Sequence, residues 1–341
     1  MGSVRLRRAA LVLGLLVAPP ALQACGGGGS TKAASSSSSA RTAPSSTTSS
    51  TVPKPDQTPK DAALEAPITT GSFQVVFHGV TVPYVPTNNF DKPAAGTVLV
   101  TVDTEVKNTG AAVAEFFADM FAVDNDNRVF NRVSSGVQPE TPKGQLAAGT
   151  GKRGLVVFQL PDGAQGPGLR LVFMPDPEKE AAYVLPLVAG GTPPAVPSVG
   201  DSDPNKTYSK GEAARIGDWG VLVVNGVTNP APPEDAKYDA PDAGFHLVVL
   251  DVTLFNMSKQ NHLADDFDPK IKDPMNQSFS TTSKRTAANT YAQRGMQDTV
   301  PPGFGLRGPV TFMVPDASGT GPLTMLVQFH STGTAIMFAL A

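Results

Sequence analysis

The chain contains one glycine-rich segment twice, and this repeat constrains its fold more than any other feature. GTGKRG at 149–154 leads into LVVFQLPD, and GFGLRG at 303–308 leads into PVTFMVPD. Both match G-x-G-x-x-G, the spacing that binds a dinucleotide pyrophosphate when it joins a strand to a helix. Here a run rich in β-branched residues and ending in proline follows each motif. We therefore interpret Gly149 and Gly303 as the starts of turns that enter a strand.

Other segments repeat in the same order along the chain. FHGVT around His78 recurs as VNGVT around Asn225, and VTVDTEVKN ending at Asn108 recurs as VVLDVTLFN ending at Asn256. VDNDNRVF and KDPMNQSF form a weaker match. Matches in one order at a nearly constant offset indicate that a single unit was duplicated. We predict two homologous domains, 68–189 and 207–341, joined by a Pro/Gly-rich linker at 190–206.

The segments within each unit are short and typical of strands. Apolar and polar residues alternate through Val100–Val106, as a half-buried strand requires, and the 33 Gly and 32 Pro supply frequent turns. About seven such strands per unit predict an all-β fold of two tandem immunoglobulin-like antiparallel β-sandwiches. One segment, AVAEFFADMF at 112–121, fits either a short helix or an irregular strand.

Three segments of the second unit carry a family resemblance: KTYSKGEAARIGDWGVLVVNGVT, FHLVVLDVTLFN and VPPGFGLRGPVTFMVPD. They resemble the telokin-like, immunoglobulin-fold domain of unknown function found in secreted Gram-positive, especially actinobacterial, lipoproteins. The resemblance extends over both repeats. It implies the sandwich fold, and it implies no particular chemistry because none is established for that family.

The N-terminus has the pattern of an export signal. Arg5, Arg7 and Arg8 precede an apolar run from Ala9 to Ala18, which is too short to span a bilayer. The run leads to Leu22-Gln23-Ala24-Cys25, which resembles a bacterial lipobox. We expect residues 1–24 to be a lipoprotein signal peptide and Cys25 to carry diacylglycerol and palmitate; the alternative is an ordinary signal peptide. Because Cys25 is the only cysteine, the mature domains cannot form a disulfide.

Residues 25–67, which begin with the lipidated cysteine, have the composition of a disordered tether. Ser, Thr and Pro dominate and little can be buried, so a flexible coil with a reach of roughly 35 Å is expected. The predicted location is the extracytoplasmic face of the bacterial cell membrane, held by the lipid anchor. The 27 basic and 30 acidic residues give a net charge of −3, which does not favour nucleic acid as a partner.

Two groups of residues have the chemistry of metal ligands, but other interpretations fit them better. Asp124-Asn125-Asp126-Asn127 could bind calcium, yet Arg128 and Val129 stand where a calcium loop needs an oxygen ligand and a glycine. We interpret this segment as an Asx turn. A copper site could use the soft ligands Met257, His262, Met275 and Met296, but their spacing is irregular, so we interpret them as packing and surface residues. A second acidic cluster consists of Asp265, Asp266, Asp268 and Asp273, which we interpret as solvated charge on a loop.

The common hydrolase motifs have no credible match, so we expect no catalytic residues, no cofactor, no bound metal and no enzymatic activity. Arg153 and Arg307 recur at equivalent positions, and each is expected to span a strand edge or pair with a surface carboxylate. The longest irregular insertion is expected from Lys259 to about Thr299. Long loops on a rigid sandwich often bind ligands, which makes Tyr291 and Arg294 a candidate binding loop.

Together these features predict a non-enzymatic, lipid-anchored cell-envelope protein. Its domains would form a binding or scaffold module for a protein or cell-wall partner. The alternatives are an extracytoplasmic protein that binds a small solute or metal ion, and an accessory domain of an envelope enzyme.

Overall fold

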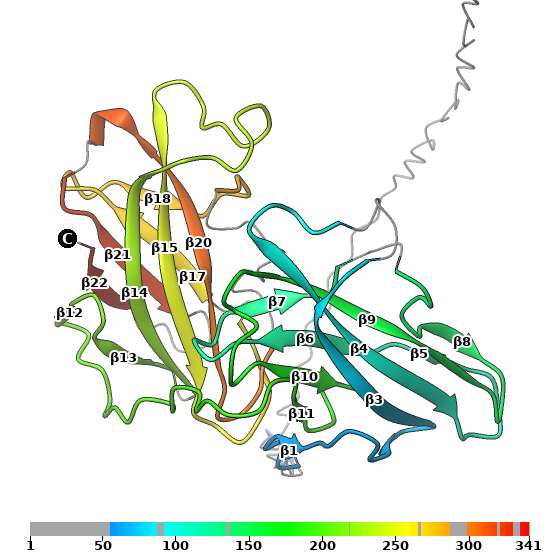
Figure 1. Ribbon diagram of the computed structural model, residues 1–341. Helices are drawn as coiled ribbons and strands as arrows, with labels where there is room; N and C mark the ends of the chain where they lie inside the picture. The colour runs from blue at the N-terminus through cyan, green and yellow to red at the C-terminus, as the bar shows by residue number, and fades with distance from the viewer. Residues whose placement is uncertain are drawn as a thin grey trace, which may run out of the picture. The chain divides into compact units, whose positions relative to one another are not determined.

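The regular secondary structure in the described part of the chain consists almost entirely of β-strands (Figure 1). The computed structural model describes residues 55–86, 92–133, 137–217, 219–264, 267–286, 299–318, 321–329 and 335–340. One short 3-10 segment, η3, covers Asp316–Ser318. Among the described residues, no helix is long and apolar enough to cross a bilayer. The predicted signal peptide, Cys25 and most of the tether lie outside these ranges.

The first sandwich consists of a four-stranded sheet in the order β2-β3-β4-β9 and a five-stranded sheet in the order β1-β11-β10-β6-β7. A two-stranded ribbon, β5-β8, joins them at one end. The strands are β1 (Lys60–Asp61), β2 (Ile68–Thr70), β3 (Phe73–Tyr84), β4 (Thr97–Asn108), β5 (Ala114–Phe116), β6 (Asp119–Val123), β7 (Val129–Asn131), β8 (Gly144–Leu146), β9 (Gly151–Pro161), β10 (Arg170–Met174) and β11 (Tyr183–Pro186).

The second sandwich repeats this arrangement strand for strand. Its sheets have the orders β13-β14-β15-β20 and β12-β22-β21-β17-β18, with the ribbon β16-β19. The strands are β12 (Thr207–Tyr208), β13 (Ala213–Ile216), β14 (Gly220–Ala231), β15 (Phe245–Asn256), β16 (His262–Leu263), β17 (Phe267–Lys272), β18 (Ser278–Ser280), β19 (Thr299–Val300), β20 (Gly305–Pro315), β21 (Thr324–Phe329) and β22 (Ala335–Ala339).

Even local irregularities recur in both sandwiches. The pairing of β3 with β4 shifts register between Phe77 and Gly79, and that of β14 with β15 shifts between Val224 and Gly226. The predicted all-β fold of two tandem sandwiches is therefore confirmed. Two details differ from the expectation: each five-stranded sheet contains one parallel pair, β1 with β11 and β12 with β22, and β1 lies ahead of Ile68.

Two ambiguous segments are resolved as strands. Residues 112–121 contain β5 and β6, and no helix forms there. The expectation of an irregular insertion starting at Lys259 was wrong for its first half, because β16, β17 and β18 occupy much of 262–280. β16 and β18 are too short to show alternation, and the alternating residues of β17 include Pro269, a residue that is uncommon in strands.

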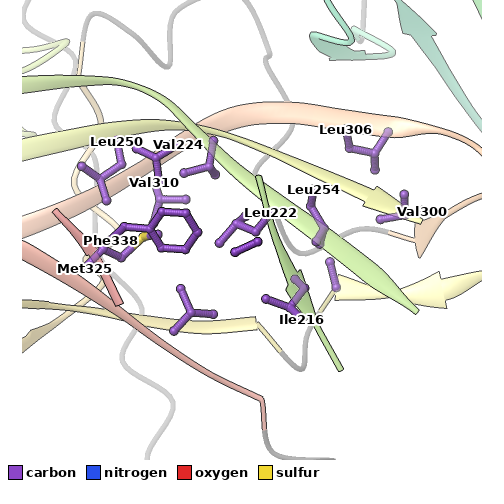
Figure 2. Close-up of a cluster of buried hydrophobic side chains, with 14 of the residues drawn as sticks. Ile216, Leu222, Val224, Leu250, Leu254, Val300, Leu306, Val310, Met325 and Phe338 are labelled. Atoms are coloured by element: carbon purple, nitrogen blue, oxygen red, sulfur yellow. The ribbon is translucent and has the colours of Figure 1, made fainter. Parts of the chain in front are cut away.

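The core of each sandwich lies between its two sheets. In β9, Val156, Phe158 and Leu160 point inward, as the alternation predicts. Figure 2 shows the matching cluster of the second sandwich, where Val310 on β20 lies among Leu222, Val224, Leu250 and Phe338.

One sheet of the first sandwich is buried on both faces. Leu171 and Phe173 of β10 belong to the core of the first sandwich, whereas Val172 belongs to the apolar cluster of the second. In β6, Met120 and Phe121 divide between the two clusters in the same way. Strands buried on both faces have continuous apolar sequences, and DMFAV and LVFM have this character. Both sandwiches accordingly belong to one compact unit, Pro53–Ala341.

Phe121 of the first sandwich corresponds to Lys270 of the second. Phe121 pairs with Val172 on β10, and Lys270 pairs with Leu326 at the equivalent position of β21. Phe121 is fully buried, whereas Lys270 is partly exposed and pairs with Asp268 at 3.2 Å. We expect Phe121→Ala to lower the free energy of unfolding by about 3–5 kcal/mol because it leaves a cavity. Lys270→Ala should change it by less than about 1 kcal/mol.

Urea denaturation followed by the fluorescence of Trp219, the only tryptophan, measures both variants. Equal losses of stability in the two variants would contradict the burial of the outer face of the β6-β10 sheet.

Candidate functional site

The two glycine motifs form the same turn at the entrance to a strand. Gly149 and Gly303 both have φ of 72°, a left-handed conformation that favours glycine. The second glycine of each motif is the first residue of β9 or β20. No helix follows either motif, so the interpretation as a turn into a strand is confirmed.

Each glycine turn is fixed by a fully buried asparagine at the end of the preceding long strand. Asn108 Nδ2 donates to the carbonyls of Ala112 (2.8 Å) and Leu146 (2.9 Å), and its Oδ1 accepts from the Gly110 amide (2.9 Å). The Gly149 amide donates to the Asn108 carbonyl at 2.9 Å. One side chain therefore connects the loop after β4, the end of β8 and, through its own backbone, the turn before β9.

Asn256 makes the same set of bonds in the second sandwich. Its Nδ2 donates to the carbonyls of Gln260 (2.6 Å) and Val300 (2.8 Å), and its Oδ1 accepts from the Ser258 amide (2.9 Å). We call these two residues the asparagine clamps. The sequence shows that a matched segment of each repeat ends in asparagine. It does not show that this asparagine bonds the backbone of neighbouring loops.

The last glycine of the first motif is needed for a close approach. A Cβ at Gly154 would lie 1.8 Å from the Glu140 carbonyl oxygen, because residues 139–141 run directly over the start of β9. The Leu155 amide donates to the Pro139 carbonyl at 2.9 Å, and Thr141 Oγ1 donates to the Leu155 carbonyl at 2.7 Å. The glycine therefore allows the crossing segment to pack against the strand.

The repeated arginines pair with repeated aspartates. Arg153 Nε and Nη2 donate to Asp103 Oδ1 and Oδ2 at 2.9 and 2.7 Å, and Arg307 Nε donates to Asp251 Oδ1 at 2.9 Å. Hydrogen bonding from Arg153 lowers the pKa of the Asp103 carboxyl, and Asp251 raises the pKa of Arg307. The predicted pairing with a carboxylate is confirmed in both copies.

A histidine is held between two glutamates on the same sheet of the first sandwich. His78 Nδ1 lies 2.8 Å from Glu65 Oε2, and its Nε2 lies 3.0 Å from Glu105 Oε2. Hydrogen bonds to Glu65 and then Glu105 raise the pKa of His78. In the second sandwich the corresponding contact is uncharged, with Asn225 Nδ2 donating to Thr253 Oγ1 at 2.8 Å.

The acidic turns are occupied by backbone amides. Asp124 Oδ1 accepts from the amides of Asp126 and Arg128, both at 2.9 Å, and burial raises the pKa of its carboxyl against the opposing effect of Arg128. Asp273 Oδ1 accepts from the amides of Met275 (2.9 Å) and Gln277 (2.8 Å). The Asx-turn interpretation is confirmed for 124–127 and extends to 273–276. Among the described residues, no group of three or more His, Cys, Asp or Glu side chains could hold a metal ion.

The described members of the copper set lie in different surroundings. The His262 ring stacks on Trp219 with centroids 4.6 Å apart, and Met257 and Met275 are exposed. Asp268 pairs with Lys270. Cys25, Tyr291, Arg294, Met296, Asp265 and Asp266 lie outside the described residues, so the lipidation and binding-loop assignments stay predictions.

A polar junction between the sandwiches involves residues that the sequence did not single out. Gln57 is 3% exposed; its amide donates to the Lys259 carbonyl (2.9 Å), and its Oε1 accepts from the Asn261 amide (2.8 Å). Asn261 Nδ2 in turn donates to the Pro177 carbonyl at 2.9 Å. A groove of about 760 Å³ lies beside these residues. The arrangement joins the segment ahead of β1 to both sandwiches.

The fold and these repeated turns define a tandem β-sandwich protein in which the same structural residues occur in each copy. A family model described as a domain of unknown function, DUF4352, matches residues 62–182 and again 208–335. The chain belongs to this family and carries its domain twice. No curated protein matches the chain in sequence.

Several solved structures are similar to parts of the chain. An uncharacterized β-sandwich protein of Clostridium difficile 630 is 15% identical, over 42% of this chain and 99% of its own, with a TM-score of 0.28. The yjhA protein of Bacillus subtilis is 14% identical, over 36% of this chain and 97% of its own, with a TM-score of 0.29. A Bacillus subtilis protein described as a candidate lipoprotein, ycdA, is 14% identical, over 41% of this chain and 38% of its own, with a TM-score of 0.27.

The asparagine clamps should be essential for stability. Asn108→Ala or Asn256→Ala removes the side-chain donor to one buried and one part-buried carbonyl, and we expect each to lower the free energy of unfolding by about 2–4 kcal/mol. Asn205→Ala, at an exposed turn residue, is the control and should change it by less than about 0.5 kcal/mol. Urea denaturation distinguishes these outcomes; a clamp variant as stable as the control would show that the bonds contribute little.

The His78 cluster should make stability depend on pH. Because folding raises the pKa of His78, the folded state binds the proton more tightly, and the cluster stabilises fully below the ordinary imidazole pKa of about 6.5. That contribution is lost as pH rises through the raised pKa. We expect the urea midpoint of the wild type to fall over this interval and that of His78→Asn to fall less. Glu140→Gln, an exposed change elsewhere, should retain the wild-type slope.

Proposed function

We propose that the chain is a non-enzymatic, lipid-anchored protein of the cell envelope whose two sandwiches form a binding or scaffold module. It would lie at the extracytoplasmic face of the bacterial cell membrane, attached through Cys25. Its partner would be a protein or a wall component. The lipobox-like segment ending at Cys25 and the Ser/Thr/Pro-rich segment after it support the anchor.

One observation carries the binding role. The polar residues that recur in both sandwiches are engaged by the fold itself: the asparagine clamps bond three backbone groups each, the arginines pair with aspartates, and the acidic turns bind their own amides. What the duplication preserved is therefore a scaffold. Joining two scaffolds through the doubly buried β6-β10 sheet presents loops at fixed positions, as protein recognition requires.

The alternative, a protein that binds a small solute or metal ion, would use a site such as the groove beside Gln57 and Asn261. That groove is lined by Asp176, Glu178 and Lys179 among others, so it has polar groups for a solute. The groove is wide open and its lining has mixed charge, whereas small-molecule sites are usually enclosed and mostly apolar. A macromolecular binding surface is therefore the favoured function.

The anchor is tested by replacing Cys25. Cys25→Ala should release the protein from the membrane fraction into the medium because a tether without acyl chains has no stable hold on the bilayer. Ser30→Ala, a change within the tether, is the matched control and should stay membrane-bound. Immunoblots of membrane and medium fractions measure both.

Retention of Cys25→Ala in the membrane after a salt wash would contradict lipid anchoring. Native mass spectrometry with divalent metal ions or small solutes tests the binding or scaffold role against the alternative function. Tight stoichiometric uptake of either by the wild type would favour the alternative.

A further inference from the structure

The two sandwiches end in equivalent tips that differ in chemistry. In the first, the tip consists of the loop 109–113 after β4 and the residues 147–150 before β9. Ala111, Ala112, Val113, Ala147 and Ala148 are exposed there, and Val113 has an exposed fraction of 63%. We call this surface the alanine tip. It carries no charged side chain.

The corresponding tip of the second sandwich is more polar and is partly covered. Lys259, Gln260 and Asn261 replace Ala111, Ala112 and Val113, while Met257, in place of Thr109, has an exposed fraction of 38%. Pro301 and Pro302, which replace Ala147 and Ala148, are buried. Residues 55–57 lie on this tip: the Gln57 amide donates to the Lys259 carbonyl, and Gln260 Nε2 donates to the Pro55 carbonyl at 2.7 Å. The three positions after the first two loop residues are therefore polar in the second tip, which residues 55–57 contact, and apolar in the alanine tip.

Several backbone groups at the alanine tip are already hydrogen-bonded within the protein. The Ala112 carbonyl accepts from Asn108 Nδ2, and the Ala147 carbonyl accepts from both the amide and the hydroxyl of Thr150, at 3.1 and 2.8 Å. The amides of Thr109 and Gly110 donate to the Ser72 carbonyl. Moving polar backbone into a medium of low dielectric is costly unless it is paired. These bonds lower that cost for the groups that make them.

Basic residues lie immediately behind the alanine tip. Lys107 on β4, Lys143 ahead of β8 and Lys152 on β9 are exposed. Glu115 is the only acidic residue in the segments 107–118 and 143–152. Phe117, just past β5, has an exposed fraction of 82%. Apolar residues at the front with lysines behind them match the interface of a bilayer with anionic headgroups.

The chain also enters the described structure at this end of the first sandwich. Gln57 Nε2 lies 3.4 Å from the Glu180 carbonyl, Glu180 Oε2 accepts from Thr70 Oγ1 at 2.8 Å, and the turn after Thr70 contacts the alanine tip through Ser72. The predicted tether from Cys25 would join the described structure at Pro55, whose carbonyl accepts from Gln260 Nε2. Its reach from residue 26 to 54 is roughly 30 Å.

From these observations we propose that the alanine tip docks onto an anionic lipid surface. This inference deepens the proposed function and rests on it, since a membrane tether would keep the tip close to the bilayer and convert a weak contact into a persistent one. Docking would set the orientation of both sandwiches, with the loops at the opposite end pointing away from the membrane.

The test uses the mature chain with Cys25→Ser, so that no acyl chain contributes. It is sedimented with vesicles of phosphatidylglycerol and phosphatidylcholine, or of phosphatidylcholine alone. We expect binding to the anionic vesicles only, weakened by salt. Val113→Asp should reduce the binding constant about tenfold or more, because a carboxylate resists transfer to the interface. Val85→Asp is the matched control: Val85 is 78% exposed and lies beyond β3, at the other end of the sandwich, and this variant should bind within about twofold of the parent.

A second readout does not depend on binding strength. Val113→Trp should show a blue-shifted emission on addition of anionic vesicles, whereas Val85→Trp should not; the buried Trp219 gives a constant background. Urea midpoints equal to the parent's verify that the variants are folded.

Two outcomes would overturn the docking proposal directly: equal vesicle binding of Val113→Asp and the parent, or no emission shift for Val113→Trp. A third would be that Val113→Asp leaves vesicle binding unchanged but abolishes self-association or binding to the cell wall. None of them bears on the anchor, because the Cys25→Ala release experiment measures that separately.

Discussion

The bonds of the asparagine clamps join, in each sandwich, the end of one long strand to the segment that leads into the next long strand. Asn108 and Leu146 are separated by 38 positions, and Asn256 and Val300 by 44, yet in each case one side-chain amide links the two segments. A carboxamide suits this position because it offers two donors and an acceptor without charge. The left-handed glycine then starts the next long strand in register. The fold of each copy thus depends on one buried polar residue at a point where the apolar core alone would not specify the path of the chain.

The duplication explains the fold but not how the copies are joined. Phe121 and Val172 cover the outer face of the β6-β10 sheet with apolar atoms, and this face contacts the second sandwich. The second sandwich has Lys270 on the equivalent face of its own sheet. The equivalent faces therefore differ in chemistry: one buries Phe121 against the other sandwich, whereas the other presents the partly exposed Lys270.

Much of this fold could be predicted from the sequence, because alternation and turn chemistry act locally. The alternating run of β4 and the G-x-G-x-R-G entrances identified strands and their order. The polar β1 and β16 could not be found in the same way, since two residues with polar or mixed side chains carry no periodicity and form strands only when a neighbour offers its edge. The role of Asn108 was equally inaccessible: its partners come from three segments that only the folded structure assembles.

For candidate sites, comparison of the two copies is more informative than either copy alone. Residues that are the same in both, such as Arg153 and Arg307 with their aspartates, serve the common fold. Where the copies differ, the fold tolerates the change, so the difference reflects the surroundings of each copy. Two differences are of this kind. His78, which lies between two glutamates, is replaced by Asn225 in the second copy, and Val113 is replaced by Asn261. Val113 and its alanine neighbours remain exposed and apolar in a copy whose counterpart shows that polar residues fit the same turn. The fold itself does not require an apolar tip there, and this difference between the copies is the observation from which the proposed lipid docking is argued.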